Sequence, residues 1–109
     1  MNPVQVVGDA ETVVAFALGG VTGRVARTAQ EARAALEAIV QQVRAAGGPV
    51  RGPALVLMTQ QAARLIREYL DHVSLDPGGP LVLEIPGFAE PIGGRPLQRF
   101  VERALGVHL

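Results

Sequence analysis

Three polar side chains of this 109-residue chain lie at or just after the ends of apolar runs. In α/β proteins, catalytic and binding residues lie at such positions. Asp9 and Thr59 each come after an apolar run, just before a helical pattern begins, and Glu84 lies near the end of the run Leu81–Ile85. If these runs are parallel strands, all three side chains lie at the carboxyl edge of one sheet, where open α/β proteins bind ligands. Each is therefore a candidate for catalysis or for contact with a partner.

The spacing of these residues does not match a phosphoacceptor or nucleotide site. A receiver-type site needs an acceptor aspartate after the third strand and a lysine after the last, whereas the third run here ends in Met58–Thr59 and the chain has no lysine. Neither a GxGxxG loop nor a Walker loop opens a helix. We interpret Asp9 and Thr59 as helix caps. A receiver-like regulatory or small-ligand-binding α/β domain is the alternative hypothesis.

Glu84 and the two histidines lack the partners that catalysis requires. A single carboxylate without a second acid, a base or a metal has no group with which to exchange protons, so Glu84 is either a solvated strand-end acid or a contact for a partner. His72 and His108 are far apart in sequence, and we interpret both as surface residues. Cysteine is absent, which removes thiolate catalysis and cysteine-based zinc sites. We expect no catalytic residue, no cofactor and no metal, and an orphan α/β enzyme is the weakest hypothesis.

Composition indicates a single globular domain. Hydrophobic residues make up 49% of the chain and charged residues 18%, which is too apolar for a disordered chain. No apolar run approaches the roughly 18 residues of a membrane span, and the amino terminus shows no secretory signal; we expect a cytoplasmic protein without membrane insertion. Ten acidic residues balance ten basic ones, and this balance argues against a nucleic-acid partner.

The elements that position these residues alternate between strand and helix. Apolar runs predict the first, third and fourth strands, and the stretch Gly23–Ala26 marks the second strand only weakly. Apolar residues at helical spacing predict the helices between and after the strands. Thr28 and Glu31 have the spacing of a capping box at the start of the clearest helix. The predicted strands are 4–7, 23–26, 53–59 and 81–85, and the predicted helices are 11–18, 28–46, 60–73 and 97–105.

This alternation predicts a parallel sheet with right-handed crossovers and helices on both of its faces. The expected fold class is α/β, a small flavodoxin-like sandwich with a four-stranded parallel sheet. Residues 1–85 form the expected core. Residues 86–109 form a Gly/Pro-rich loop and a carboxyl-terminal helix of the same domain, and the long loop predicts that this helix is less firmly docked.

Four segments together resemble the F subunits of the V/A-type rotary ATPases of prokaryotes, which translocate protons or sodium ions. They are residues 7–21, 54–70, 81–87 and 97–109. The family opens with Gly-Asp-x-x-Thr-Val-x-x-Phe-x-Leu-x-Gly, a pattern met here between Gly8 and Gly20. The strand ending in Glu-Ile-Pro matches at residues 84–86, and the closing Ala-Leu-Gly-Val pattern matches at residues 104–107. The resemblance covers nearly the whole chain in the right order.

The resemblance implies a non-catalytic protein of the rotor. The F subunits of that family bind the D subunit, the long coiled coil of the central stalk, and turn with it inside the ring of A and B subunits. They help couple ATP hydrolysis or synthesis to ion transport, in the peripheral sector of a membrane-bound complex. The expected partners are therefore the D subunit and, transiently, the A/B ring.

We expect the contact surface at the end of the fourth strand and on the last helix. The helix 97–105 carries an apolar stripe, and the arginines around it are spaced four apart, as a cationic ridge that could pair with acids of the ring. We expect this helix to dock on the sandwich and to exchange part of that contact for the ring. The interface candidates are Asp9, Thr12, Glu84, Ile85, Pro86, Gly87, Arg95, Arg99 and Arg103.

Overall fold

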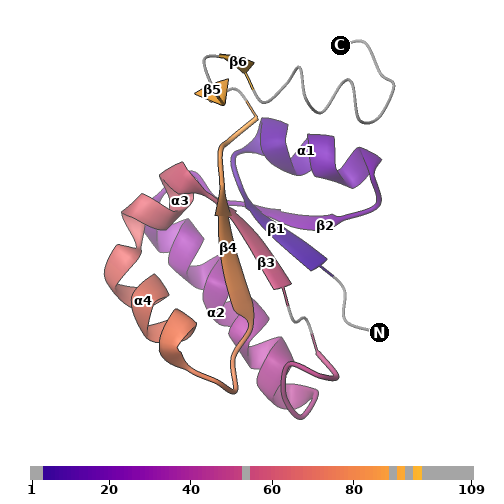
Figure 1. Cartoon of the computed structure of the whole chain (residues 1–109), viewed down its shortest axis with the longest axis vertical. Coiled ribbons are helices and arrows are strands. Elements are labelled where there is room, and N and C mark those ends of the chain that lie inside the picture. The colour runs from indigo at the N-terminus through magenta and orange to yellow at the C-terminus, as the bar shows by residue number, and fades with distance from the viewer. Residues whose placement is uncertain (1–3, 53–54, 89–90, 93–94, 97–109) are drawn as a thin grey trace.

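The computed structural model of the chain describes residues 4–52, 55–88, 91–92 and 95–96. Within these residues, strands alternate with helices as far as the fourth strand (Figure 1). The elements in chain order are β1 (Val4–Gly8), α1 (Ala10–Leu18), β2 (Thr22–Val25), α2 (Ala29–Ala45), β3 (Leu55–Thr59), α3 (Gln60–Leu65), α4 (Arg67–Leu75), β4 (Leu81–Ile85), β5 (Pro91–Ile92) and β6 (Arg95–Pro96).

The first four strands form one parallel sheet in the order β2-β1-β3-β4. The chain therefore starts in the interior of the sheet, adds β2 on one side, and crosses back to add β3 and β4 on the other. This topology is that of a small flavodoxin-like α/β fold, so the predicted fold class is confirmed.

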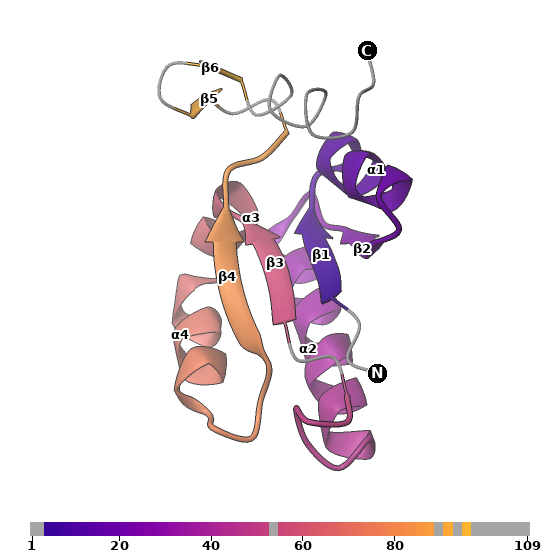
Figure 2. The same cartoon turned by 45° about the vertical axis from the view of Figure 1, so that its right-hand side comes forward.

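Side chains of a strand point alternately to the two faces of the sheet, and the helices divide between these faces. The Gln5 side chain of β1 donates a hydrogen bond to the side-chain oxygen of Gln42 in α2, so one face, which we call the α2 face, carries α2, α3 and α4. Val6 of β1 points to the opposite face, and its side chain and that of Val13 in α1 both lie beside Gly23. The opposite face, the α1 face, therefore carries α1 (Figure 2).

The main core lies between the sheet and the helices of the α2 face. A continuous cluster of buried apolar side chains gathers there because α2 presents a stripe at helical spacing to the strands. Leu36 and Ile39 of α2 have no exposed surface, and neither does Met58 of β3. The apolar face predicted for this helix from the sequence is confirmed, as is its cap, because the Thr28 hydroxyl accepts a hydrogen bond from the Glu31 amide.

Two segments differ from the sequence prediction. The helix predicted over 60–73 is divided at Ile66, whose backbone angles of φ −130° and ψ 32° leave the helical region. Periodicity misses this break because the buried positions of α3 and α4 remain in phase across it. The loop predicted over 86–96 contains the short antiparallel pair of β5 and β6.

Two further predictions concern the carboxyl-terminal helix and the lack of a membrane-spanning helix. The helix predicted over 97–105 lies outside the described residues. In the described part, no helix combines the length and the apolar character that crossing a membrane requires.

Candidate functional site

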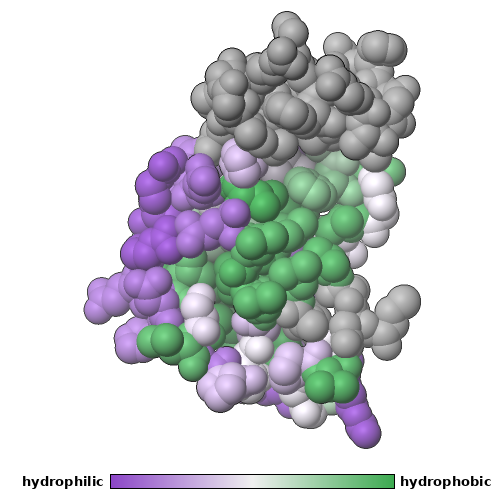
Figure 3. Space-filling model, in the orientation of Figure 1, coloured by the Kyte–Doolittle hydropathy of each residue, from purple (hydrophilic) through white to green (hydrophobic). Residues whose placement is uncertain are grey.

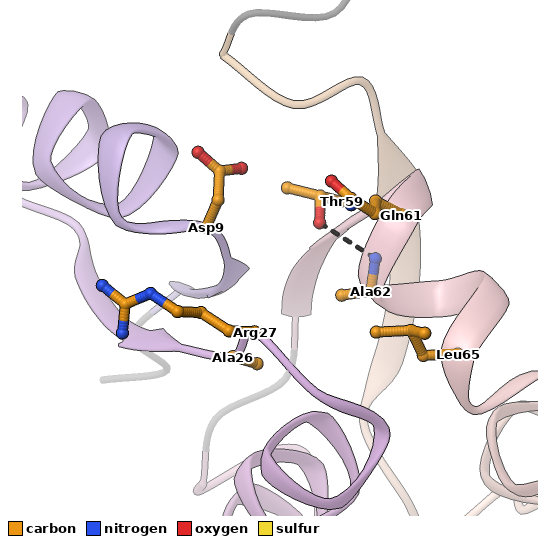
Figure 4. Close-up of a pocket in the computed structure, with 7 residues that line it drawn as sticks. All are labelled: Asp9, Ala26, Arg27, Thr59, Gln61, Ala62 and Leu65. Atoms are coloured by element: carbon orange, nitrogen blue, oxygen red, sulfur yellow. Dashed lines mark hydrogen bonds between the residues drawn. The ribbon is translucent and has the colours of Figure 1, made fainter.

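A small pocket lies at the carboxyl edge of the sheet, beyond the ends of β1, β2 and β3. It has a volume of about 140 Å³ and occupies the place where open α/β sheets bind ligands. Asp9 and Thr59 both line it, so the sequence prediction that they meet at this edge is confirmed. Figure 4 shows the pocket and its lining residues, Asp9, Ala26, Arg27, Thr59, Gln61, Ala62 and Leu65.

Asp9 uses both carboxylate oxygens to begin α1. Its Oδ2 accepts a hydrogen bond from the Thr12 amide at 3.0 Å, and its Oδ1 accepts one from the Thr12 hydroxyl at 2.7 Å. The aspartate thereby satisfies one of the free N–H groups of the first turn, as expected of a helix cap. The carboxylate is engaged within the protein rather than directed at a ligand.

Thr12 connects this cap to the chain beyond β4. The Thr12 side chain is fully buried, and its hydroxyl accepts a hydrogen bond from the Phe88 amide at 2.7 Å. Phe88 is itself 7% exposed. A single hydroxyl therefore holds the segment after β4 against the amino-terminal turn of α1, across 76 residues of sequence.

Thr59 has the same role at the start of α3. Its hydroxyl accepts a hydrogen bond from the Ala62 amide at 3.3 Å, and only 1% of the residue is exposed. Gly8, directly before Asp9, lies so close to Thr59 that an added Cβ would collide with the threonine side chain. The cap prediction made for Asp9 and Thr59 is confirmed at both positions.

Glu84 forms an ion pair that sequence reasoning did not find. Its two carboxylate oxygens each accept a hydrogen bond from the Arg67 guanidinium, both at 2.7 Å, which joins β4 to the start of α4. Such a forked arrangement is the strongest geometry for an arginine and a carboxylate. The Arg67 guanidinium lowers the pKa of Glu84, and the carboxylate in turn raises the pKa of Arg67.

The Arg67 side chain also approaches Asp71, at 3.9 Å. The sequence carried no signal for the pairing of Arg67 with Glu84, because it depends on how α4 lies across the sheet. Glu84 is thus neither a free acid nor a pocket residue. It faces the α2 side of the sheet, opposite Met58 in the strand register, and the pocket beside Asp9 does not include it.

The remaining sequence candidates are placed as follows. Ile85 and Pro86 are half-buried and Gly87 is buried. Arg95 belongs to β6, while Arg99 and Arg103 lie outside the described residues. His72 is exposed on α4, and His108 lies outside the described residues.

The chemistry that this edge can support is limited. No cluster of three or more His, Cys, Asp or Glu that could hold a metal ion occurs within the described residues. The carboxylates Asp9 and Glu84 are each bound by protein groups, and Figure 4 shows the Arg27 guanidinium turned away from Thr59 and Gln61. The groups that line the pocket in the described part do not include a nucleophile with an adjacent base.

Two comparisons with known proteins indicate the same family. The family described as ATP synthase (F/14-kDa) subunit matches the chain over residues 4–102. The F subunit of the A-type ATP synthase of Methanothermobacter thermautotrophicus is 28% identical over an alignment 109 residues long, and this alignment covers 97% of this chain and 94% of that protein. The likeness thus extends over every strand and helix described above.

Proposed function

The chain belongs to the family of ATP synthase (F/14-kDa) subunits, the F subunits of A/V-type ATP synthases, and from this premise we propose that it is a non-catalytic part of the central stalk. It binds the D subunit and turns with it inside the A/B ring, and so helps couple ATP hydrolysis or synthesis to ion translocation. The observation that carries the proposal is the family match from β1 past β6.

The geometry of the carboxyl edge supports a non-catalytic role. Asp9 and Thr59 are used as helix caps, and Glu84 is bound by Arg67. These were the groups that an enzyme or a receiver domain of this fold would have directed at a ligand. The geometry therefore favours a binding protein over the receiver-like or small-ligand-binding alternative. Its place would be the cytoplasmic, peripheral sector of the complex.

The proposed rim contact with the D subunit lies at the end of β4. Glu84 and Ile85 reach it from the edge strand, and Pro86 and Gly87 continue it toward α1. Asp9 and Thr12 contribute by holding this segment, since the Thr12 hydroxyl binds the Phe88 amide. Because β4 is an edge strand, a partner can approach this rim without displacing another strand.

Co-expression with the D subunit tests the central proposal. We expect a one-to-one complex that remains intact in size-exclusion chromatography, and no ATP hydrolysis by the purified chain alone. ATP turnover that co-purifies with the chain and vanishes on mutation of its own residues would contradict the non-catalytic role. Failure to recover the chain with the D subunit would contradict the assignment to the stalk.

The Arg67–Glu84 pair allows a specific test of the rim. Reversing Glu84 alone would place two cations together, so the change is made as the exchange Arg67→Glu with Glu84→Arg, which keeps an ion pair. The matched control exchanges Arg33 and Glu37, an exposed pair on α2 with an N–O distance of 2.9 Å. We expect weaker binding of the D subunit only for the first exchange. Equal binding by both would remove Glu84 from the interface.

The last proposal concerns residues 86–109 and the contact with the ring. Arg95, Arg99 and Arg103 would pair with acids of the ring as the stalk turns. The apolar stripe over 97–105 would dock on the sandwich in the isolated chain and exchange part of that contact for the ring. Deletion of residues 96–109 should then leave binding to the D subunit intact and change the ATP hydrolysis rate of the reassembled complex. Normal assembly with an unchanged rate would refute this regulatory role.

A further inference from the structure

The α1 face of β3 and β4 is an exposed apolar surface. Strand register places Leu55 beside Leu81, Leu57 beside Leu83 and Thr59 beside Ile85 on this face. Leu81 is 69% exposed and Leu83 is 52% exposed, although both lie in a regular strand of the sheet. Every side chain that β3 and β4 present here is apolar except that of Thr59, which is buried.

Figure 3 shows this surface as a hydrophobic area over the strands, while hydrophilic residues gather beside it on the side of α3 and α4. In soluble proteins, a contiguous exposed apolar surface that is bordered by polar residues marks an interaction site.

The α1 face also lacks a helix that the other face has. Strands are spaced at about 4.8 Å, so a four-stranded sheet is about 15 Å wide and accepts two helices packed about 8–10 Å apart. On the α2 face, α2 and the α3–α4 pair lie side by side in one layer (Figure 2). Within the described residues, the α1 face carries α1 alone, over β1 and β2. The uncovered lane over β3 and β4 has the width of one helix.

The outer side of α1 is apolar as well. Val14 is 59% exposed and Leu18 is 62% exposed, and the two lie one helical turn apart. Glu11 is the only charged residue of this nine-residue helix. A helix that is apolar on all sides is usually buried in its working assembly. The chain therefore has two neighbouring apolar surfaces, the lane over β3–β4 and the outer side of α1.

We infer that these two surfaces are the main seat of the D subunit, with one helix of its coiled coil lying in the lane over β3–β4 beside α1. This inference rests on the proposed function. A long two-helix partner can cover the lane and the outer side of α1 together. The chain's own segment 97–109 has one apolar stripe over nine residues, which is enough for the lane but not for both surfaces.

The chemistry of the lane defines the partner's surface. Because the lane presents leucine and isoleucine and no charge, the helix that fills it must present an apolar stripe, as a coiled coil does where its heptad face is open. Glu84 points to the opposite face of the sheet. The seat of the D subunit is thus centred on Leu83, and the rim at Glu84 is its border.

A competition experiment tests the seat directly. The D subunit is co-expressed in limiting amount with two differently tagged copies of this chain, one wild type and one Leu83→Arg, and mass spectrometry gives the share of each in the purified complex. The matched control is Leu75→Arg, which adds the same charge at an 82% exposed leucine on α4, on the other face of the sheet. We expect Leu83→Arg to be under-represented at least tenfold and Leu75→Arg to equal the wild type.

The outcomes separate this inference from the proposed function. If the wild-type chain is recovered with the D subunit and Leu83→Arg takes an equal share, the D subunit binds elsewhere and the inference is overturned while the stalk assignment stands. The inference is also overturned if Leu83→Arg takes an equal share of the complex but turns a dimer of the free chain into a monomer, because a second copy of the chain then covers this surface. It is overturned as well if the share is equal and Leu83→Arg exposes residues 97–109 to hydrogen exchange, because the chain's own end then covers it.

If the wild type is not recovered with the D subunit, both the proposed function and the inference are overturned. Thermal unfolding of each variant verifies its fold. Leu81→Gln, a milder change at the most exposed position of the lane, replaces Leu83→Arg if the latter unfolds, and is expected to lower the share of the variant several-fold.

Discussion

Replacing Thr12 with valine removes the hydroxyl that connects three parts of the molecule. That hydroxyl donates to Asp9 Oδ1 and accepts from the Phe88 amide, both at 2.7 Å. Valine keeps the shape of the side chain and deletes only these bonds, whereas serine keeps the hydroxyl and deletes a methyl group. The pair of variants therefore separates hydrogen bonding from packing at a fully buried position.

The magnitude follows from the two groups left without a partner. The Phe88 amide is buried, and an unsatisfied buried donor costs about 1–3 kcal/mol. Asp9 is half-buried, so water replaces its lost bond at a cost of roughly 0.5–1 kcal/mol. Thr12→Val should therefore lower the free energy of unfolding by about 1.5–4 kcal/mol. Thr12→Ser should lower it by about 0.5–1.5 kcal/mol, as for other losses of one buried methyl group.

Urea unfolding followed by circular dichroism measures both changes, and hydrogen exchange reports the Phe88 amide directly. We expect Thr12→Val to accelerate exchange at Phe88 well beyond the change in global stability, and Thr12→Ser to leave it close to wild type. Equal stability of the two variants, or unchanged protection of the Phe88 amide in Thr12→Val, would refute the reasoning that this hydroxyl holds the segment after β4.

Three further changes test the packing and the ion pair. Gly8→Ala places a methyl group against the buried Thr59 side chain and should lower the free energy of unfolding by about 1–3 kcal/mol in urea; a neutral result would contradict the close approach. Leu36→Ala empties a fully buried position of α2 and should cost about 2–5 kcal/mol in the same assay. Because Arg67 lowers the pKa of Glu84 below its ordinary value of 4.5, the pair stabilises the fold fully above about pH 4.5 and progressively less as the pH falls through the lowered pKa. The free energy of unfolding of the wild type should therefore exceed that of Glu84→Gln by about 0.2–1 kcal/mol at neutral pH, and this difference should shrink below pH 4.5. A difference that does not change with pH would contradict the pairing.

The order of elements was readable from the sequence because it depends on local patterns. Apolar runs predicted three of the four strands of the sheet, and β2 was only weakly marked in the sequence. The capping residues Asp9, Thr28 and Thr59 predicted where three helices begin. The break at Ile66 was not readable, since the buried positions keep the same helical phase on both sides of it. The β5–β6 pair was missed because two residues are too few for a period of two to appear.

The sequence by itself determined the alternation of strand and helix, the caps, and the absence of lysine and cysteine that removed several kinds of active site. The tertiary structure decided the contacts between residues distant in the chain, namely Arg67 with Glu84 and Thr12 with Phe88. It also decided that Leu81 and Leu83 stay exposed. Apolar residues in a strand look alike in sequence whether a helix covers them or not, because periodicity reports the face on which a side chain lies, and only the packing of the whole chain determines what lies against that face.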